Sequence, residues 1–211
     1  MDFEAYNPLD ERNLGASVAE ALLERTPIPL ASLPSFKGAG IYAIYYTGDF
    51  PAYEKIADRN RDGRFEYPIY VGKAVPSGAR KGGGKGQAGS SLFSRLIDHR
   101  KSIEAASNLR VDDFSVRVLV VTDIWIPLGE SLLITKLAPV WNTIVEGFGN
   151  HTPGAGRFLG MRPRWDVVHP GRHWAARCAD RLETADQIVE EVRAYTLTAA
   201  VPAKPKLMLD E

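Results

Sequence analysis

The chain has 211 residues, of which 45% are hydrophobic, and its 26 basic and 26 acidic side chains give a net charge of zero. This size and composition suit one domain with additions and a core large enough to fold alone. The single cysteine, Cys178, excludes an internal disulfide, and no apolar run reaches the roughly 18 residues of a membrane span. Because the acidic start also lacks the features of a signal peptide, we expect a cytoplasmic protein.

The charges are unevenly spread along this neutral chain. Residues 1–35 carry two basic and six acidic side chains, residues 72–110 carry eight basic and two acidic, and residues 157–177 carry five basic and one acidic. Two positive segments in a neutral chain predict a polyanion held in a defined cleft. The alternative is that both are ordinary solvated faces, since Lys and Arg are common on surfaces.

The first predicted element is a helix from Asn13 to Arg25, because Val18, Ala19, Leu22 and Leu23 recur at helical spacing. Pro27 and Pro29 cannot continue it. We interpret residues 1–35 as an N-terminal helical arm that packs on the rest of the chain.

Two short strands follow, at Gly40–Tyr46 and Pro68–Lys73, because β-branched and aromatic residues alternate there with small ones. The 21 residues between them predict a decorated strand pair with a short helix near residues 52–57. Period-two alternation puts Tyr42 on one face, and puts Tyr70 on the face of Gly72, whose bare backbone a ligand can approach. The alternative is that these residues are only good strand formers packed on a helix.

Residues 75–89 predict a basic loop. Either Arg80, Lys81 and Lys85 in this loop contact phosphates, or the loop is only a linker. Gly84–Gly89 also matches the pattern G-x-G-x-x-G, which raises a nucleotide-binding alternative. That fingerprint requires a strand running straight into the glycines, whereas about ten loop residues intervene here.

The next predicted helix spans residues 91–106, and its apolar stripe is formed by Leu92, Phe93, Leu96, Ile97 and Ile103. Arg95 and His99 lie one turn apart on the edge of that stripe, so both heads point toward the sheet. They provide a guanidinium fork and a titratable nitrogen, as phosphate chemistry requires. The alternative is a snorkelling Arg and a half-buried His.

A strand is predicted at residues 113–122, and Pro127 begins a helix that ends before Pro139. On that helix Glu130 lies in line with Leu133 and Leu137, so its carboxylate projects into the apolar face. An unpaired buried carboxylate is costly. We therefore expect Glu130 either to pair with a cation or to bind a metal.

The remaining predictions cover the last third of the chain. Asn142 lies in a segment, residues 140–145, that we expect to be extended. Residues 147–157 predict a turn-rich loop, which is either a surface loop only or a reader of base edges through Asn150, His151 and Arg157. Residues 165–169 predict a strand before a helix opened by Pro170 and Gly171. A last helix begins at a capping box made by Thr184 and Gln187.

Gly40-Ile41-Tyr42 and Tyr70-Val71-Gly72, followed in order by Arg95, Glu130 and Asn142, resemble the GIY-YIG nucleases over residues 36–150. Val71 stands where many members have Ile. His99 stands where others have a second Tyr, which resembles a small subgroup of type II restriction endonucleases, as do residues 141–157 and 165–174. The resemblance implies an α/β protein of the α+β type, with a small central antiparallel sheet flanked by helices. Residues 36–150 would form the catalytic core and residues 151–211 a C-terminal extension packed on it.

The resemblance also implies Mg²⁺-dependent cleavage of double-stranded DNA, with one ion per active site and Mn²⁺ as a substitute. From the subgroup we expect a GC-rich palindrome such as CCGCGG, read by a homodimer on DNA, because a palindrome mirrors two-fold protein symmetry. A cognate DNA methyltransferase of the same restriction–modification system would be the partner enzyme. The DNA contacts would come from a larger set of residues: Lys73, Arg80, Lys81, Lys85, Asn150, His151 and Arg157.

Each residue of the motif suits one part of phosphodiester hydrolysis. Tyr42, with a reference pKa of about 10, would act as base or orient the water only with positive charge nearby. Arg95 suits the scissile phosphate, Glu130 the Mg²⁺ ion, and Asn142 would fix Glu130 or the phosphate.

Tyr70 and His99 would orient water or handle protons. Two other classes of function remain open: a DNA-binding module without cleavage, and a nucleotide-binding enzyme that uses the glycine loop.

Overall fold

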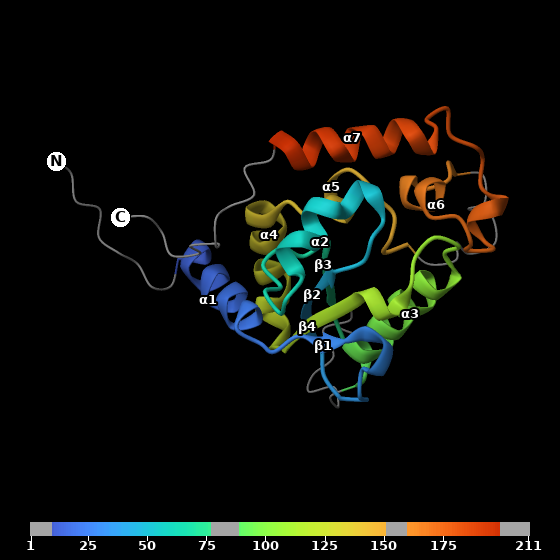
Figure 1. Ribbon diagram of the computed structural model, residues 1–211. Coiled ribbons are helices and arrows are strands. Elements are labelled where there is room, and N and C mark those ends of the chain that lie inside the picture. Colours follow the sequence, from blue (N-terminus) through green and yellow to red (C-terminus); the bar gives the residue numbers. More distant parts are fainter. Residues whose placement is uncertain (1–9, 77–88, 151–159, 199–211) are drawn as a thin grey trace.

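The computed structural model describes residues 10–76, 89–150 and 160–198, and its centre is a four-stranded antiparallel sheet (Figure 1). The strand order is β1-β4-β2-β3, with β1 at Ile28–Pro29, β2 at Gly40–Tyr46, β3 at Tyr70–Ala74 and β4 at Phe114–Val120. In the register, Tyr42 lies opposite Gly72 on one side and Val118 on the other. The predicted α+β fold with a small central antiparallel sheet is confirmed.

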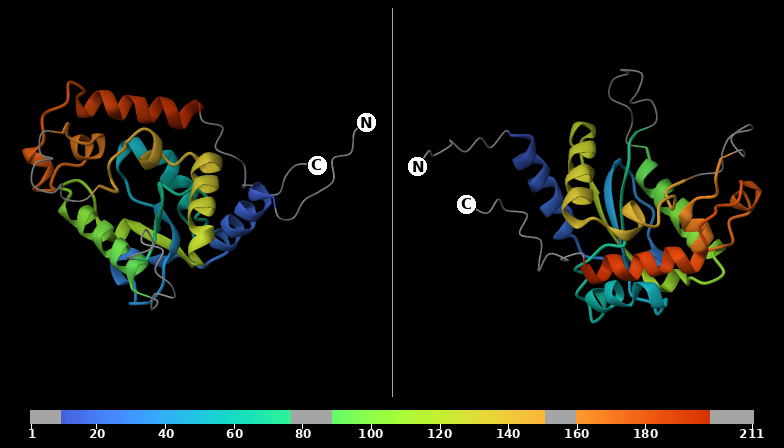
Figure 2. Two further views of the ribbon diagram at one scale, coloured as in Figure 1. Left: turned by 180° about the vertical axis from the view of Figure 1, so that it is seen from behind. Right: turned by 90° about the horizontal axis from the view of Figure 1, so that it is seen from above.

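Helices cover both faces of the sheet, as the view from above in Figure 2 shows. On one face lie α1 (Glu11–Leu23) and α4 (Ile126–Leu137), which pack on each other. The other face is covered by α2 (Glu54–Asn60), α3 (Ser91–Ala105), α5 (Val140–Thr143), α6 (Arg164–Val168) and α7 (Ala185–Thr198). Short 3₁₀ turns lie at Leu30–Ser32, Pro51–Tyr53, Val111–Asp113, Asp123–Trp125 and Ala175–Arg177.

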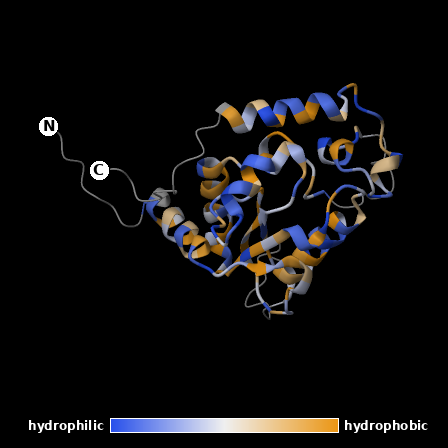
Figure 3. Cartoon of the chain, viewed as in Figure 1, coloured by the Kyte–Doolittle hydropathy of each residue, from blue (hydrophilic) through white to orange (hydrophobic). Residues whose placement is uncertain are grey.

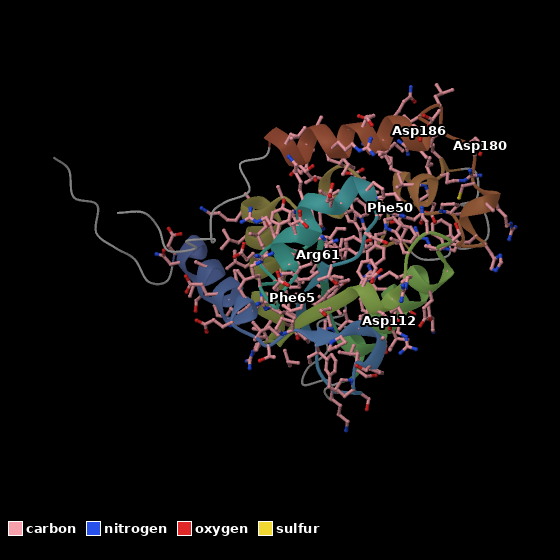
Figure 4. All side chains as sticks on the ribbon, in the orientation of Figure 1. Phe50, Arg61, Phe65, Asp112, Asp180 and Asp186 are labelled. Atoms are coloured by element: carbon pink, nitrogen blue, oxygen red, sulfur yellow. The ribbon has the colours of Figure 1, made fainter. Side chains whose placement is uncertain are left out.

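Strand β2 is buried along its whole length because each face meets its own hydrophobic core. Ile41, Ala43 and Tyr45 point into the core under α1 and α4. Tyr42 and Ile44 point into the larger core, which holds large aromatic side chains from α5 and α6. Hydrophobic positions accordingly gather where the helices face the sheet (Figure 3), and side chains fill the space between the ribbons (Figure 4).

Two glycines permit close approach between neighbouring elements. Gly40 has a φ of +159°, and a Cβ atom there would lie 2.0 Å from the carbonyl oxygen of Leu119 in β4. Gly129 of α4 faces Val18 of α1, where a Cβ atom would lie 2.6 Å from a Val18 methyl carbon. The first glycine of the Gly-Ile-Tyr motif is therefore required by strand packing.

Most predicted helices are found, and the capping box of α7 is confirmed by hydrogen bonds between Thr184 and Gln187 at 2.9 and 3.2 Å. Two predictions are wrong: residues 140–145 contain α5 and residues 165–169 overlap α6, where strand-like segments were expected. Pro139 and Pro163 precede these helices at the N-cap, and burial of one Trp in each outweighs the strand preference of their residues.

The predicted helix after Pro170 and Gly171 is also absent, since the described chain forms only the turn at Ala175–Arg177. Gly171 has a φ of +151°, and a Cβ atom there would lie 1.7 Å from the carbonyl oxygen of Ala105 at the end of α3. Close packing on α3 therefore replaces helix formation at this point.

The division into an arm at residues 1–35, a core at 36–150 and an extension at 151–211 stays a prediction. The described part of the arm contributes β1, which pairs with β4, and α1, which packs on α4. In the described ranges, none of the helices is both long and apolar enough to span a membrane.

A buried polar network joins α5 and α6 inside the larger core. The Tyr53 hydroxyl donates to His169 Nε2 at 2.7 Å and accepts from Trp141 Nε1 at 2.9 Å, and His169 Nδ1 donates to Asn108 Oδ1 at 2.9 Å. These partners suit a neutral imidazole. Burial, with the nearby charge of Arg172, lowers the pKa of His169 to about 3.

We predict that this histidine makes the fold sensitive to acid. Below about pH 6.5 the unfolded chain protonates His169 while the folded chain does not, so stability is lost as pH falls from 6.5 toward 3. The free energy of unfolding should fall by up to about 1.4 kcal/mol per pH unit from this group. Urea unfolding between pH 6.5 and 4.5 should show a smaller pH slope for His169→Gln than for wild type. The exposed His173→Gln is the control, and equal slopes in all three proteins would contradict the prediction.

Candidate active site

Two phenols share one face of the sheet where β2 and β3 pair. The ring centroids of Tyr42 and Tyr70 lie 6.2 Å apart, as the predicted shared face requires. A Cβ atom at position 72 would lie 2.4 Å from the Tyr42 hydroxyl oxygen. Gly72 is therefore needed to leave room for the phenol of Tyr42.

Helix α3 brings Arg95 and His99 to this face. The Tyr42 hydroxyl lies 2.5 Å from His99 Nε2, and His99 is buried. The His99 ring stacks on Phe148 with centroids 4.5 Å apart and an interplanar angle of 17°. Both predicted side chains of α3 thus point toward the sheet.

The turn at residues 147–150 closes over these groups. Arg95 Nη2 donates to the carbonyl oxygen of Gly149 at 2.8 Å, and Phe148 packs edge-on against Tyr70 with centroids 5.0 Å apart. A Cβ atom at position 149 would lie 2.6 Å from the Tyr70 hydroxyl oxygen. The glycine lets the backbone touch the second phenol.

Burial raises the pKa of both phenols, so each is protonated at neutral pH. For Tyr42 the neighbouring Tyr70 adds to the rise, and the Arg95 guanidinium opposes it by its charge and by hydrogen bonding. For Tyr70 the charge of Arg95 opposes the rise as well, while the Glu130 carboxylate raises the pKa of both. The positive charge that the sequence argument required beside Tyr42 is supplied by Arg95.

Glu130 of α4 forms an ion pair with Lys73 of β3, with Oε2 and Nζ 2.6 Å apart. The carboxylate side chain is 17% exposed and Lys73 is 39% exposed. The cation expected beside a buried Glu130 is therefore Lys73.

Glu130 is also an acid that can hold a divalent cation here. Within the described residues, no group of three or more His, Cys, Asp or Glu side chains is arranged to hold a metal. Mg²⁺ keeps most of its waters and binds through one or two carboxylates together with substrate phosphates. The donor set around Glu130 thus fits Mg²⁺ when a phosphate is present, and does not fit a metal caged by protein alone.

Asn142 fastens α5 to the edge strand. Its Oδ1 accepts from the backbone N–H of Val71 at 2.8 Å, and its Nδ2 donates to the Val71 carbonyl at 2.9 Å. These bonds go to β3, not to Glu130. Asn142 therefore fixes the strand that carries Tyr70 and Lys73.

The candidate DNA contacts are placed only in part. Arg80, Lys81, Lys85, His151, Arg157 and the glycine-loop residues 84–88 lie outside the described residues, so their roles stay predictions. Lys73 pairs with Glu130. Asn150 is exposed at the end of the turn, and its carbonyl accepts from Arg172.

Sequence reasoning missed four residues that support the site: Phe148, Gly149, Asp166 and Arg172. Glycines on both sides of an aromatic residue in Gly147-Phe148-Gly149 were a signal, since the backbone must approach something closely there. Nothing in the sequence indicated the pairing of Asp166 with Arg172, whose guanidinium donates to both carboxylate oxygens.

We predict that Asn142→Ala destabilises the fold, because it leaves the Val71 N–H and C=O without partners at the sheet edge. The free energy of unfolding should fall by about 2 kcal/mol. The control is the next residue, Thr143→Ala, which loses only a local bond to the Pro139 carbonyl and should cost less than about 1 kcal/mol. Urea unfolding measures both, and an Asn142→Ala protein as stable as wild type would exclude the strand-fastening role.

Comparison with known families agrees with this geometry. The family model described as the Eco29kI GIY-YIG domain matches residues 34–196, which include β2 to β4, α3 to α6 and every residue of the site. No curated protein matches the chain. Since the match covers most of the chain, the protein belongs to the Eco29kI GIY-YIG family of restriction endonucleases and is a nuclease that acts on DNA.

Proposed function

We propose that this nuclease is a type II restriction endonuclease that hydrolyses both strands of duplex DNA at a GC-rich palindrome with Mg²⁺. The observation that carries the proposal is the meeting of Tyr42, Tyr70, Arg95 and His99 on one sheet face, with the Glu130 carboxylate close enough to affect both phenols. The Tyr42–His99 contact also supports membership of the subgroup with His in place of a second Tyr.

The proton-handling unit of the proposed reaction is Tyr42 with His99. When Nε2 of His99 is unprotonated, the Tyr42 hydroxyl donates a hydrogen bond to it over 2.5 Å. The phenol oxygen then keeps its lone pairs to accept the proton of the attacking water. As that proton arrives, the phenol's own proton passes to His99. A free phenolate is never needed, which suits a Tyr whose pKa burial raises.

Arg95 would bind the scissile phosphate. Its guanidinium is permanently charged and offers a planar fork to phosphate oxygens, while its contact to the Gly149 carbonyl fixes the direction of the side chain. Tyr70 lies beside Tyr42 and is also affected by the charge of Arg95, so it would orient the water or the leaving oxygen.

Glu130 would hold Mg²⁺, and Lys73 would move to a DNA phosphate when the ion binds. When bound, Mg²⁺ neutralises charge on the phosphate and lowers the pKa of a bound water. Lys73 suits both the ion pair with Glu130 and the proposed phosphate contact, because it is partly exposed and carries a long flexible stem.

The recognition site and the assembly belong to the same proposal. A homodimer on DNA would place two active sites in two-fold symmetry, which matches a palindrome such as CCGCGG. A nuclease of this kind requires that the host genome be protected, so a cognate methyltransferase is the proposed partner.

The Lys73–Glu130 ion pair favours one alternative, a DNA-binding module without cleavage. In that case Lys73 neutralises Glu130 permanently and no metal enters. The deciding experiment is digestion of a plasmid of known sequence with Mg²⁺, followed by sequencing of the ends. Discrete fragments with identical ends support the endonuclease, and binding without any cleavage supports the module.

We predict that Glu130→Gln separates these functions. The amide keeps the shape of the side chain, and the partly exposed Lys73 tolerates loss of its partner, so thermal stability should stay within a few degrees of wild type. DNA binding should be equal or tighter, because a negative charge near phosphates is removed. Cleavage should fall by about 1,000-fold, since a bound metal supplies several kcal/mol to the transition state.

The matched control is Glu104→Gln, an exposed acid of α3 paired with Arg100, which should cut as wild type does. Adding EDTA should abolish wild-type cleavage, and Mn²⁺ should restore it. Equal cutting by wild type and Glu130→Gln would refute the metal role of Glu130, as would cleavage that persists in EDTA.

A further inference from the structure

The side chain of Arg172 is almost completely buried and is fully engaged. Its Nε and Nη2 donate to the two carboxylate oxygens of Asp166 at 2.6 and 2.5 Å, and these side chains are 4% and 1% exposed. The guanidinium lies over the rings of Trp165 and Trp174, 4.5 and 4.7 Å from their centroids. Burial raises the pKa of the Asp166 carboxyl, and the hydrogen bonds and charge of Arg172 oppose that rise.

The remaining donors of Arg172 all go to one turn. Nη1 donates to the carbonyls of Phe148 and Asn150 at 3.0 and 3.1 Å, and Nη2 donates to the carbonyl of Gly147 at 3.0 Å. With the two bonds to Asp166, the five N–H groups of the guanidinium have five acceptors. Lysine, with three donors on one atom, cannot reproduce this pattern.

That turn touches three of the groups assigned to catalysis. Phe148 stacks on His99, the Gly149 carbonyl accepts from Arg95, and Gly149 lies against the Tyr70 hydroxyl. Arg172 reaches this turn through three of its backbone carbonyls. A shift of this turn would therefore move the His99 ring and the Arg95 fork together.

We infer that Arg172 and Asp166 are positioning residues, which hold the turn at residues 147–150 so that His99 and Arg95 meet the DNA in reactive geometry. This inference rests on the proposed function. A buried ion pair is weak evidence for stability by itself, because desolvation offsets most of its attraction. The three hydrogen bonds of Arg172 to one turn are explained by the precision that the turn requires, since a displacement of about 1 Å in an active site slows catalysis about 100-fold.

The test is Arg172→Lys compared with Arg164→Lys. Arg164 lies on the same short helix as Asp166 and also joins two acids and a carbonyl, namely Glu183, Glu191 and Ile144, but it does not contact the turn. Both variants are expected to lower Tm. Only Arg172→Lys should slow single-turnover cleavage at saturating DNA, by about 100-fold, with DNA Kd within about threefold of wild type. Equal cleavage rates for the two variants would overturn the inference.

A double-mutant cycle separates positioning from a general loss of structure. Phe148→Leu keeps an apolar side chain but removes the ring stacked on His99. If Arg172 acts through this turn, the Arg172→Lys, Phe148→Leu protein should cut within about threefold of Arg172→Lys alone, because coupled sites are not additive. Rate losses that multiply in the double variant would argue against the inference.

Guanidinium rescue covers the case in which Arg172→Lys fails to fold. Arg172 lines an open pocket of about 460 Å³ with Lys101, Ser102, Ala105, His173, Trp174 and Arg177, so a guanidinium ion can reach the space left by Arg172→Ala. Low-millimolar guanidinium should restore cleavage by Arg172→Ala, and NaCl at the same ionic strength should not. A folded Arg172→Ala protein that cuts at the wild-type rate without guanidinium would refute the inference. Wild type that cuts no DNA would refute the proposed function as well.

Discussion

The hydrogen bond between the Tyr42 hydroxyl and His99 Nε2 is the contact on which the site depends. It joins the central strand to α3 across the larger core, and it forms only because Gly72 leaves the opposite register position empty. Both ends are buried, so the bond is shielded from competing water. The Gly-Ile-Tyr and Tyr-Val-Gly motifs are therefore packing requirements first: one glycine admits a neighbouring strand and the other admits a phenol.

The parts of the fold that the sequence predicted are those with strong local periodicity. Alternation of β-branched and aromatic residues with small ones predicted β2 and β3. The apolar stripe of α3 correctly predicted that Arg95 and His99 point toward the sheet. Residues 140–145 and 165–169 were predicted wrongly because their β-branched and aromatic residues are buried in short helices after prolines. Local preference loses to tertiary burial in such short segments.

The interactions that hold the turn at residues 147–150 could not be predicted, because their acceptors are backbone carbonyls. Arg172 binds three carbonyls, and which carbonyls a guanidinium meets depends on how the C-terminal extension folds onto the turn. Lys73 was expected to contact DNA, and nothing in its spacing from Glu130, 57 residues away, indicated an ion pair. Long-range polar pairs of this kind have no period in the sequence.

The charges of Arg95 and Glu130 act on the same two phenols, Tyr42 and Tyr70. Arg95 lowers the pKa of both phenols against the effect of burial, whereas the Glu130 carboxylate raises it. Neutralising Glu130 therefore makes the phenols more acidic, and it does so whether the cation is the Lys73 ammonium or a divalent metal. Under the proposed mechanism, a divalent cation carries one more positive charge than the ammonium that it replaces. Tyr42 would then pass its proton to His99 more readily when the Glu130 carboxylate is neutralised, because that carboxylate raises the pKa of Tyr42.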